Sequence, residues 1–244
     1  RIGNIYGVAS EDMTQFADKF TNALVYLGNT SAATESEITN TMMRISSATR
    51  QLGISQADAL GISATIAGIG ARPELGGTAV QRIFLELLDA ATAAVDSDKV
   101  QQFAQIIGVT GEEFQSLVRT DPTNTFIRVL NSLNDIQRGG GNLRNVLGDV
   151  DLTGIRLIDV IGRLTGATGL LQTNINGANQ AWDTGTARQE EFNKRSITLE
   201  SAVIELKNAF VALGFTLEKL LGPTITVIIE AIKRAIQAFI ALPE

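Results

Sequence analysis

The sequence predicts an all-α protein, and three observations support this. Apolar residues recur every three to four positions along most of the 244 residues, which is the spacing of one helix face. Residues that start helices and glycines that end them stand between these periodic segments. Only four prolines interrupt a chain rich in alanine and leucine. We expect a compact multi-helix region over residues 1–187, followed by long amphipathic, coiled-coil-like helices in a stem over 188–244.

The first four helices are predicted from their start and stop residues. A T-x-x-E capping box, in which two side chains satisfy free helix N–H groups, gives the clearest start. The other starts place a residue that can accept a hydrogen bond just before an apolar periodic run. The predicted helices are 10–27 from Ser10 to Gly28, 34–52 from Thr34 and Glu37 to Gly53, 55–69 from Ser55 and Asp58 to Gly70, and one from Thr78 and Gln81 after a loop at 71–77.

Shorter helices follow. Thr110 with Glu113 forms a second capping box, and Pro122 suits a first helical turn because its missing N–H has no helical partner there. The predicted ranges are 97–107 up to Gly108, 111–118, 122–138 up to the glycines at 139–141, two short helices within 142–165, and 167–187. Within 142–165 the residues expected to be buried are Leu152, Ile155, Leu157, Ile158 and Ile161.

The last third of the chain carries two apolar stripes with alternating spacings of four and three residues, a pattern typical of helices packed side by side. The first, which we call the seam, consists of Leu199, Val203, Leu206, Phe210, Leu213, Leu217 and Leu220. The second, the terminal stripe, follows the Gly222-Pro223 break and consists of Ile225, Ile229, Ile232, Ile236 and Phe239. These twelve residues are the candidate contact site.

Two interpretations of each stripe stay open. The seam either joins copies of the chain, with isoleucine-rich positions favouring trimers, or packs on the preceding region. For the terminal stripe we favour a contact between subunits, because little chain remains to cover it. A simple membrane span is disfavoured by Glu230, Lys233 and Arg234 in its middle, but a helix lying on a membrane surface stays open.

Composition excludes several classes of function. The chain has no cysteine and no histidine, which removes disulfides, thiolate or imidazole metal sites, and catalytic triads that need histidine. Carboxylate pairs remain at Glu11/Asp12, Glu112/Glu113 and Glu190/Glu191, but adjacent acids in a helix point in different directions, and the first two pairs are expected in first turns. We therefore predict no enzyme activity, no cofactor and no metal.

The balance of charge bears on partners. The net charge of −6 argues against specific nucleic-acid binding, which needs clustered Lys and Arg. The chain begins with Arg1, not Met, and no signal peptide follows. We expect it to be a piece of a longer protein.

An ordered set of short segments resembles the core of phage tail tape measure proteins, over roughly residues 20–221. The segments are Thr34–Ile38, Leu52–Ser55, Gly68–Gly70, Gly76–Arg82, Phe103–Gly108, Glu113-Phe114, Asp121–Thr123 and Gly154–Asp159.

This resemblance implies a protein that lies in the tail tube lumen or at the tail tip, that fixes tail length during assembly in the host cytoplasm, and that leaves ahead of the DNA. Because each helical residue adds a constant rise of about 1.5 Å, residue count can set a length. The implied partners are further copies (a trimer, possibly a hexamer), tail tube proteins, tail-tip or baseplate hub proteins, tail assembly chaperones and the host membrane on ejection. The seam and the terminal stripe would then contact either further copies or the tail tube and tail tip, and for the terminal stripe the tube wall is an alternative to a second subunit. The alternative is a helical membrane-active, pore-forming or envelope-penetrating protein.

Overall fold

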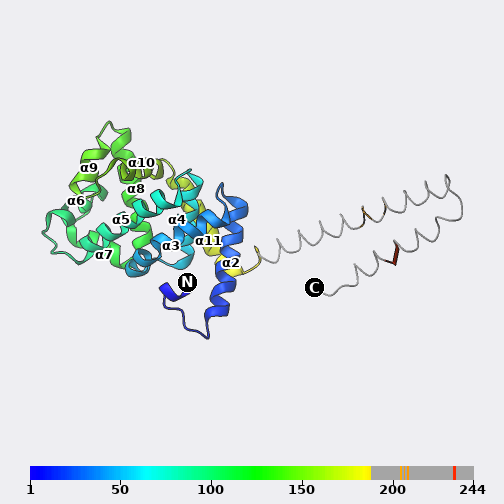
Figure 1. Cartoon of the computed structure of the whole chain (residues 1–244). Coiled ribbons are helices and arrows are strands. Elements are labelled where there is room, and N and C mark those ends of the chain that lie inside the picture. The colour runs from blue at the N-terminus through cyan, green and yellow to red at the C-terminus, as the bar shows by residue number, and fades with distance from the viewer. Residues whose placement is uncertain (188–203, 205, 207, 209–232, 235–244) are drawn as a thin grey trace. The chain divides into compact units, whose positions relative to one another are not determined.

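The structure is a computed structural model that describes residues 1–187 and, beyond them, residues 204, 206, 208, 233 and 234. The described residues form eleven helices and no strand, which confirms the all-α fold class (Figure 1). Residues 1–187 belong to one compact unit. The predicted stem and its Gly222-Pro223 break lie outside the described residues, so the boundary at 187/188 stays a prediction.

The helices follow one another closely along the chain. Their bounds are α1 Ile2–Ile5, α2 Met13–Thr30, α3 Glu35–Leu52, α4 Gln56–Gly68, α5 Pro73–Thr92, α6 Asp98–Ile107, α7 Gly111–Thr120, α8 Pro122–Arg138, α9 Leu143–Asp149, α10 Ile155–Thr165 and α11 Thr168–Thr184.

The predicted capping boxes form as expected. Before α3, the Glu37 backbone N–H donates to the Thr34 hydroxyl at 3.3 Å, and the Thr34 N–H donates to the Glu37 carboxylate at 2.9 Å. Thr110 and Glu113 repeat this reciprocal arrangement before α7. Single side-chain caps open α4 at Ser55 and α8 at Asp121. Local sequence therefore sets four of the helix starts.

Several predicted glycine stops are also confirmed. Gly53 and Gly108 follow α3 and α6 with φ of 79° and 69°, in the left-handed region that favours glycine. The next residue then donates its N–H to a carbonyl five residues back, at 2.8 Å for Ile54 to Thr49 and 3.0 Å for Val109 to Ala104. This pattern satisfies the last carbonyl groups of each helix.

The predicted bounds of α2 are wrong at both ends. The helix begins at Met13 after turns that contain Ser10, and it continues through Gly28 to Thr30. Gly28 lies under the side chain of Glu35, and a Cβ there would lie 2.7 Å from the Glu35 Cγ. The glycine therefore makes room for α3 instead of ending α2.

The predicted loop at 71–77 is also wrong, because α5 begins at Pro73. The Thr78 hydroxyl donates to the Glu74 carbonyl at 2.6 Å, as a threonine inside a helix does, and caps no helix start. Gly76 and Gly77 lie within the first turns of α5, where a methyl group on Gly76 would overlap Ile66 of α4. At these positions glycine is needed for close packing between helices, so its presence does not mark the end of a helix.

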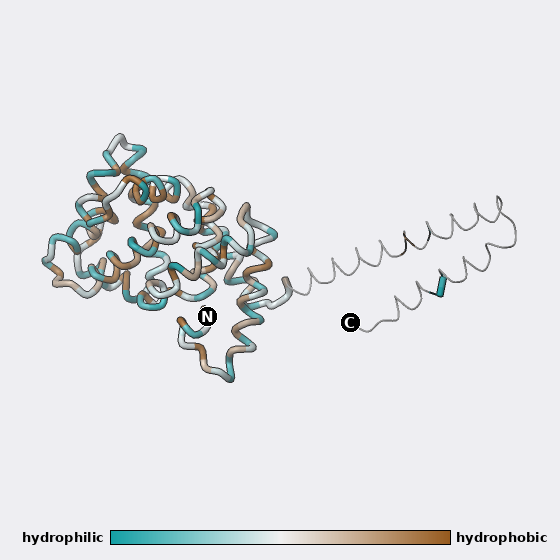
Figure 2. Tube along the Cα trace, in the orientation of Figure 1, coloured by the Kyte–Doolittle hydropathy of each residue, from teal (hydrophilic) through white to brown (hydrophobic). Residues whose placement is uncertain are grey.

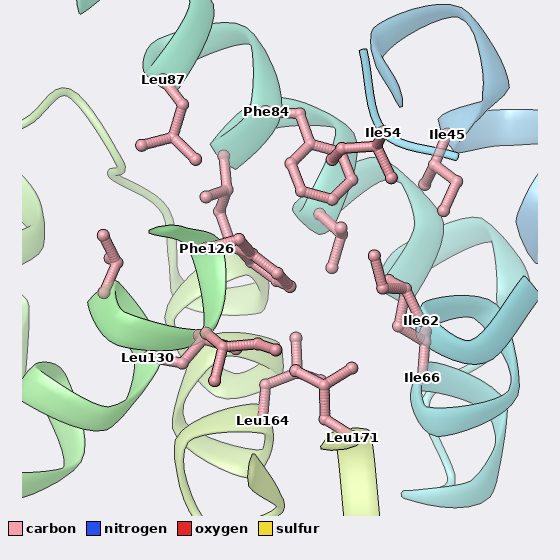
Figure 3. Packing of buried hydrophobic residues seen from close by; sticks show 14 of the residues in the cluster. Ile45, Ile54, Ile62, Ile66, Phe84, Leu87, Phe126, Leu130, Leu164 and Leu171 are labelled. Carbon is pink, nitrogen blue, oxygen red and sulfur yellow. The ribbon is translucent and has the colours of Figure 1, made fainter. Parts of the chain in front are cut away.

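The core is built around α4, which is buried along most of its length. Helices α2, α3, α5 and α11 pack against it. Figure 3 shows how aliphatic and aromatic side chains from several helices converge, among them Ile62 and Ile66 of α4, Phe84 of α5 and Phe126 of α8. The Phe84 and Phe126 rings meet edge to face with centroids 4.9 Å apart. Figure 2 shows apolar residues (brown) and polar residues (teal) mixed along the helices of this unit.

The polar segment predicted at 167–187 forms a regular helix, α11, with Thr168–Thr184 as its bounds. Its backbone comes so close to α4 that a Cβ on Gly61 would lie 2.6 Å from the Ile175 Cα. Polar side chains bridge the same interface, since the Asn174 amide donates to the Thr65 hydroxyl at 3.0 Å. The polar character of α11 thus serves packing with α4.

Candidate functional site

The predicted contact site falls almost wholly outside the described residues. Of the seam and the terminal stripe, the structure describes only Leu206, and this residue is 56% exposed. Ile204, which neighbours the seam, is 49% exposed. Neither observation decides between a contact with another copy and packing on the preceding region, so both interpretations stay predictions.

The carboxylate pairs occupy ordinary positions. Glu112 and Glu113 lie in the first turn of α7, and hydrogen bonds from the Thr110 backbone and hydroxyl lower the pKa of Glu113. Glu11 and Asp12 precede α2 and do not lie in its first turn, contrary to expectation, because the helix begins later than predicted. Glu190 and Glu191 lie outside the described residues.

Two further findings concern the described part of the chain. Nowhere in it do three or more acidic side chains lie together in a group that could hold a metal ion. Across the same residues, no helix is both long enough and apolar enough to cross a membrane.

A groove lies between the N-terminal half of α5 and α10. It comprises a hollow of about 670 Å³ and a second of about 450 Å³, which share Glu74, Leu75 and Arg156 in their walls. We call these two hollows the α5–α10 groove. Its floor and rim expose two large apolar side chains, Leu75 at 38% and Ile155 at 77%.

The exposure of Ile155 corrects a prediction, because this residue was expected to be buried. Ile155 lies nine residues before the fully buried Leu164. Nine residues are about two and a half helical turns, so the two side chains point in opposite directions. Leu152 and Ile161 are buried as predicted, whereas Leu157 and Ile158 are only partly buried. The buried face of α10 is therefore narrower than its apolar content suggests.

Four arginines line the groove, and they fall into two pairs. Arg82 and Arg163 each bind an acid one turn away, Glu86 at 2.6 Å and Asp159 at 3.1 Å. Arg72 and Arg156, by contrast, have no carboxylate within 4.0 Å among the described residues. Because an arginine carries five N–H donors and a permanent charge, this pair leaves the groove with free donors.

A cluster of charges holds the loop that leads into α10. Glu86, whose side chain is 5% exposed, binds Lys99 at 2.5 Å as well as Arg82. Lys99 also reaches the Asp151 carboxylate at 3.3 Å, and its pKa is raised chiefly by the hydrogen bond to Glu86. Asp151 stands in the left-handed region, with φ of 62°. The cluster therefore fixes a strained turn next to the groove.

Sequence reasoning missed this groove. Its two walls come from segments far apart in the chain, and the Arg82 guanidinium, for example, contacts the carbonyl of Asp151, 69 residues away. The single local signal was Arg72-Pro73, where proline marks a first helical turn.

Comparison with known proteins adds the family. Residues 2–148 match the model of the phage-related minor tail protein family. The matched range spans more than half of the chain and contains α1 to α8 and nearly all of α9. No curated protein and no solved structure matches the chain. The matched range includes the α5 wall of the groove and the helices that form most of the core. The chain therefore belongs to the phage-related minor tail protein family, and it is a structural component of a phage tail.

Proposed function

We propose that the protein is a tape measure protein, which fixes tail length during assembly and is released during genome ejection. Its membership of a minor tail protein family supports this, as does the ordered set of segments that resembles tape measure cores. In this proposal it acts as a scaffold without enzyme activity or cofactor.

We further propose that the described unit anchors the protein and that the ruler lies in other parts of it. The observation that carries this is the folding of eleven described helices onto one core. As one continuous helix, residues 1–187 would reach about 280 Å, but the longest described helix, α5, has 20 residues and measures about 30 Å. A unit folded back on itself adds little length, and it offers surfaces for docking.

The proposed partners come from the resemblance to tape measure proteins. The protein would lie in the tail tube lumen or at the tail tip of the virion, as a trimer or possibly a hexamer. It would contact tail tube proteins and the tail-tip or baseplate hub, after tail assembly chaperones have received it in the host cytoplasm. The acidic net charge would keep it from binding the DNA that shares the tube.

Tail lengths of assembled particles test both parts of the proposal. An in-frame deletion in a long helical region of the full gene should shorten tails by about 1.5 Å per residue removed. A destabilising substitution in the described unit, Gly61→Ala, should reduce the number of tails without changing the length of those that form. Tails of unchanged length after the deletion would contradict the ruler, and shortened tails in Gly61→Ala would contradict the anchor.

The membrane-active alternative depends on the terminal stripe, whose spacing of apolar residues suits a helix lying on a lipid surface. Co-sedimentation of the full chain with vesicles of anionic phospholipid tests it. Binding that disappears with Ile229→Asp and Ile232→Asp would favour this alternative over the tape measure role.

A further inference from the structure

Two surfaces at opposite ends of α5 have complementary character. At the N-terminal end is the α5–α10 groove, with free guanidinium groups on Arg72 and Arg156. Just beyond the C-terminal end is an exposed surface that we call the acidic loop, formed by Val95, Asp96, Asp98 and Glu112.

The acidic loop lacks cationic partners. None of its three carboxylates has a Lys or Arg nitrogen within 4.0 Å among the described residues. Two nearby cations are engaged elsewhere. Arg119 donates to the Ala91 carbonyl at 2.8 Å and to Gln115 at 3.2 Å, and Lys99 binds Glu86.

We propose that the α5–α10 groove of one copy binds the acidic loop of a second copy, head to tail. The carboxylates of the loop supply the acceptors that Arg72 and Arg156 lack, and planar guanidinium groups bind carboxylates in paired hydrogen bonds. Val95, which is 37% exposed, supplies an apolar side chain for the exposed Leu75 and Ile155. The acidic loop thus provides partners for the free arginines and the exposed apolar side chains of the groove, and the groove provides partners for the carboxylates and Val95 of the loop.

The geometry requires two copies. Arg72 stands just before the 20-residue helix α5 and the acidic loop just after it, so about 30 Å of helix separates this arginine from the loop of its own chain. A contact between two different patches is heterologous, and repeating it gives a ring if the rotation closes or an open row of subunits if it does not. This association goes beyond the proposed function, and it does not depend on whether the protein sets tail length.

The groove fits a protein surface better than nucleic acid. Three acids, Glu74, Asp151 and Asp159, line the groove beside the four arginines, so its surplus of positive charge is small and suits a few carboxylates better than the closely spaced phosphates of nucleic acid. The exposed Ile155 and Leu75 would meet only a charged backbone in a nucleic-acid complex, whereas an acidic loop with an apolar residue covers them.

Charge exchange tests the proposal with the full 244-residue chain. Arg156→Glu reverses the charge of the groove, and because this position is in the first turn of α10, an acid there suits the helix dipole and leaves the fold intact. Asp96→Arg replaces one of the three negative charges of the loop by a positive one, at a position outside any helix. In sedimentation velocity at 50 mM salt, the self-association constant of each variant alone should be at least about tenfold lower than that of the unaltered chain.

An equimolar mixture of the two variants is the decisive sample. The unaltered loop of the Arg156→Glu chain fits the unaltered groove of the Asp96→Arg chain. On the two altered surfaces, the exchanged positions again carry opposite charges. Association in the mixture should therefore return to within about threefold of the unaltered chain, and it should weaken in 0.5 M salt as charges are screened. Arg144→Glu, in the exposed first turn of α9, is the matched control and should behave like the unaltered chain.

Three outcomes would overturn the proposal. The first is an unaltered chain that stays monomeric at 50 mM salt, and the second is association that neither variant weakens, which would assign self-association to the seam. The third is a mixture that fails to recover. A short DNA duplex serves as a separate probe, since DNA binding that Arg156→Glu abolishes, without any change in self-association, would make the groove a nucleic-acid site instead.

Discussion

The side-chain amide of Asn179 in α11 donates a hydrogen bond to Asp58 Oδ1 in α4 at 2.6 Å, across 121 residues of sequence. The other carboxylate oxygen of Asp58 accepts from the Thr123 hydroxyl of α8 at 2.8 Å. One carboxylate near the start of the central helix therefore joins three helices of the unit. Because these groups are partly or fully shielded from water, losing the carboxylate leaves the Thr123 hydroxyl without its acceptor and the Asn179 amide with only the Ile175 carbonyl.

We expect Asp58→Ala to lower the free energy of unfolding by about 2 kcal/mol, because two interhelical hydrogen bonds to a charged acceptor are lost. Urea unfolding followed by circular dichroism measures this. Asp135→Ala, at an exposed position of α8, is the control and should change stability by less than about 0.5 kcal/mol. Equal effects of the two substitutions would show that Asp58 does not join the helices.

Gly61→Ala should destabilise the unit by at least about 2 kcal/mol. The added Cβ would lie 2.6 Å from the Cα and 2.7 Å from the backbone nitrogen of Ile175, and backbone atoms cannot move aside without separating α4 from α11. Gly169→Ala in α11 is the matched control, because nothing lies within 4 Å of its added Cβ. Thermal unfolding should show a lower Tm for the first variant and an equal or higher Tm for the second, since alanine favours helix. A Tm unaffected by Gly61→Ala would refute the close approach.

The start of α5 can be tested at two threonines. Thr34 caps α3, so Thr34→Ala should cost about 1 kcal/mol of stability. Thr78 lies inside α5, and its hydroxyl only bonds to the carbonyl of Glu74, so Thr78→Ala should be neutral or slightly stabilising. A loss at Thr78 as large as that at Thr34 would mean that a helix starts at Thr78 after all. Chemical denaturation of both variants decides the question.

Lys99→Met should destabilise the protein by about 2 kcal/mol, because the nearly buried Glu86 carboxylate keeps only Arg82 as a partner. The pKa of Lys99 is raised in the fold, so its contribution is complete below the ordinary lysine pKa and is lost only as pH rises through the higher folded value. The loss measured by urea unfolding should therefore be the same at pH 6 and pH 9. Arg144→Met, at an exposed site, provides the comparison.

Acid should weaken the cap of α3. Hydrogen bonds from the Thr34 backbone and hydroxyl lower the pKa of Glu37 below its usual value. Its contribution is thus present above the unfolded pKa of about 4.3 and is lost as pH falls through the lower folded pKa. Glu37→Ala should lower Tm at pH 7, and the gap to the unaltered chain should narrow between pH 5 and pH 3. A gap independent of pH would contradict the role of the charge.

Features of local sequence were enough to predict many helix ends. A capping box such as Thr34 with Glu37 involves residues three apart, and a left-handed glycine such as Gly53 bonds within its own helix end. These interactions form within a single turn, so no distant residue is needed to establish them. The apolar periodicity that predicted an all-α core is local for the same reason.

Packing between distant segments settled the remaining features. Gly28 and Gly76 lie inside helices although both were predicted outside them, and their small size leaves room for the side chains of Glu35 and Ile66 on neighbouring helices. The sequence pattern around each glycine does not show that it is needed for this packing. Ile155 is exposed because the rest of α10 turns a different face to the core. The α5–α10 groove likewise exists only after α5 and α10 meet. Residues far apart in the chain share a surface only once the core has placed them, and for this reason local patterns could not reveal the groove.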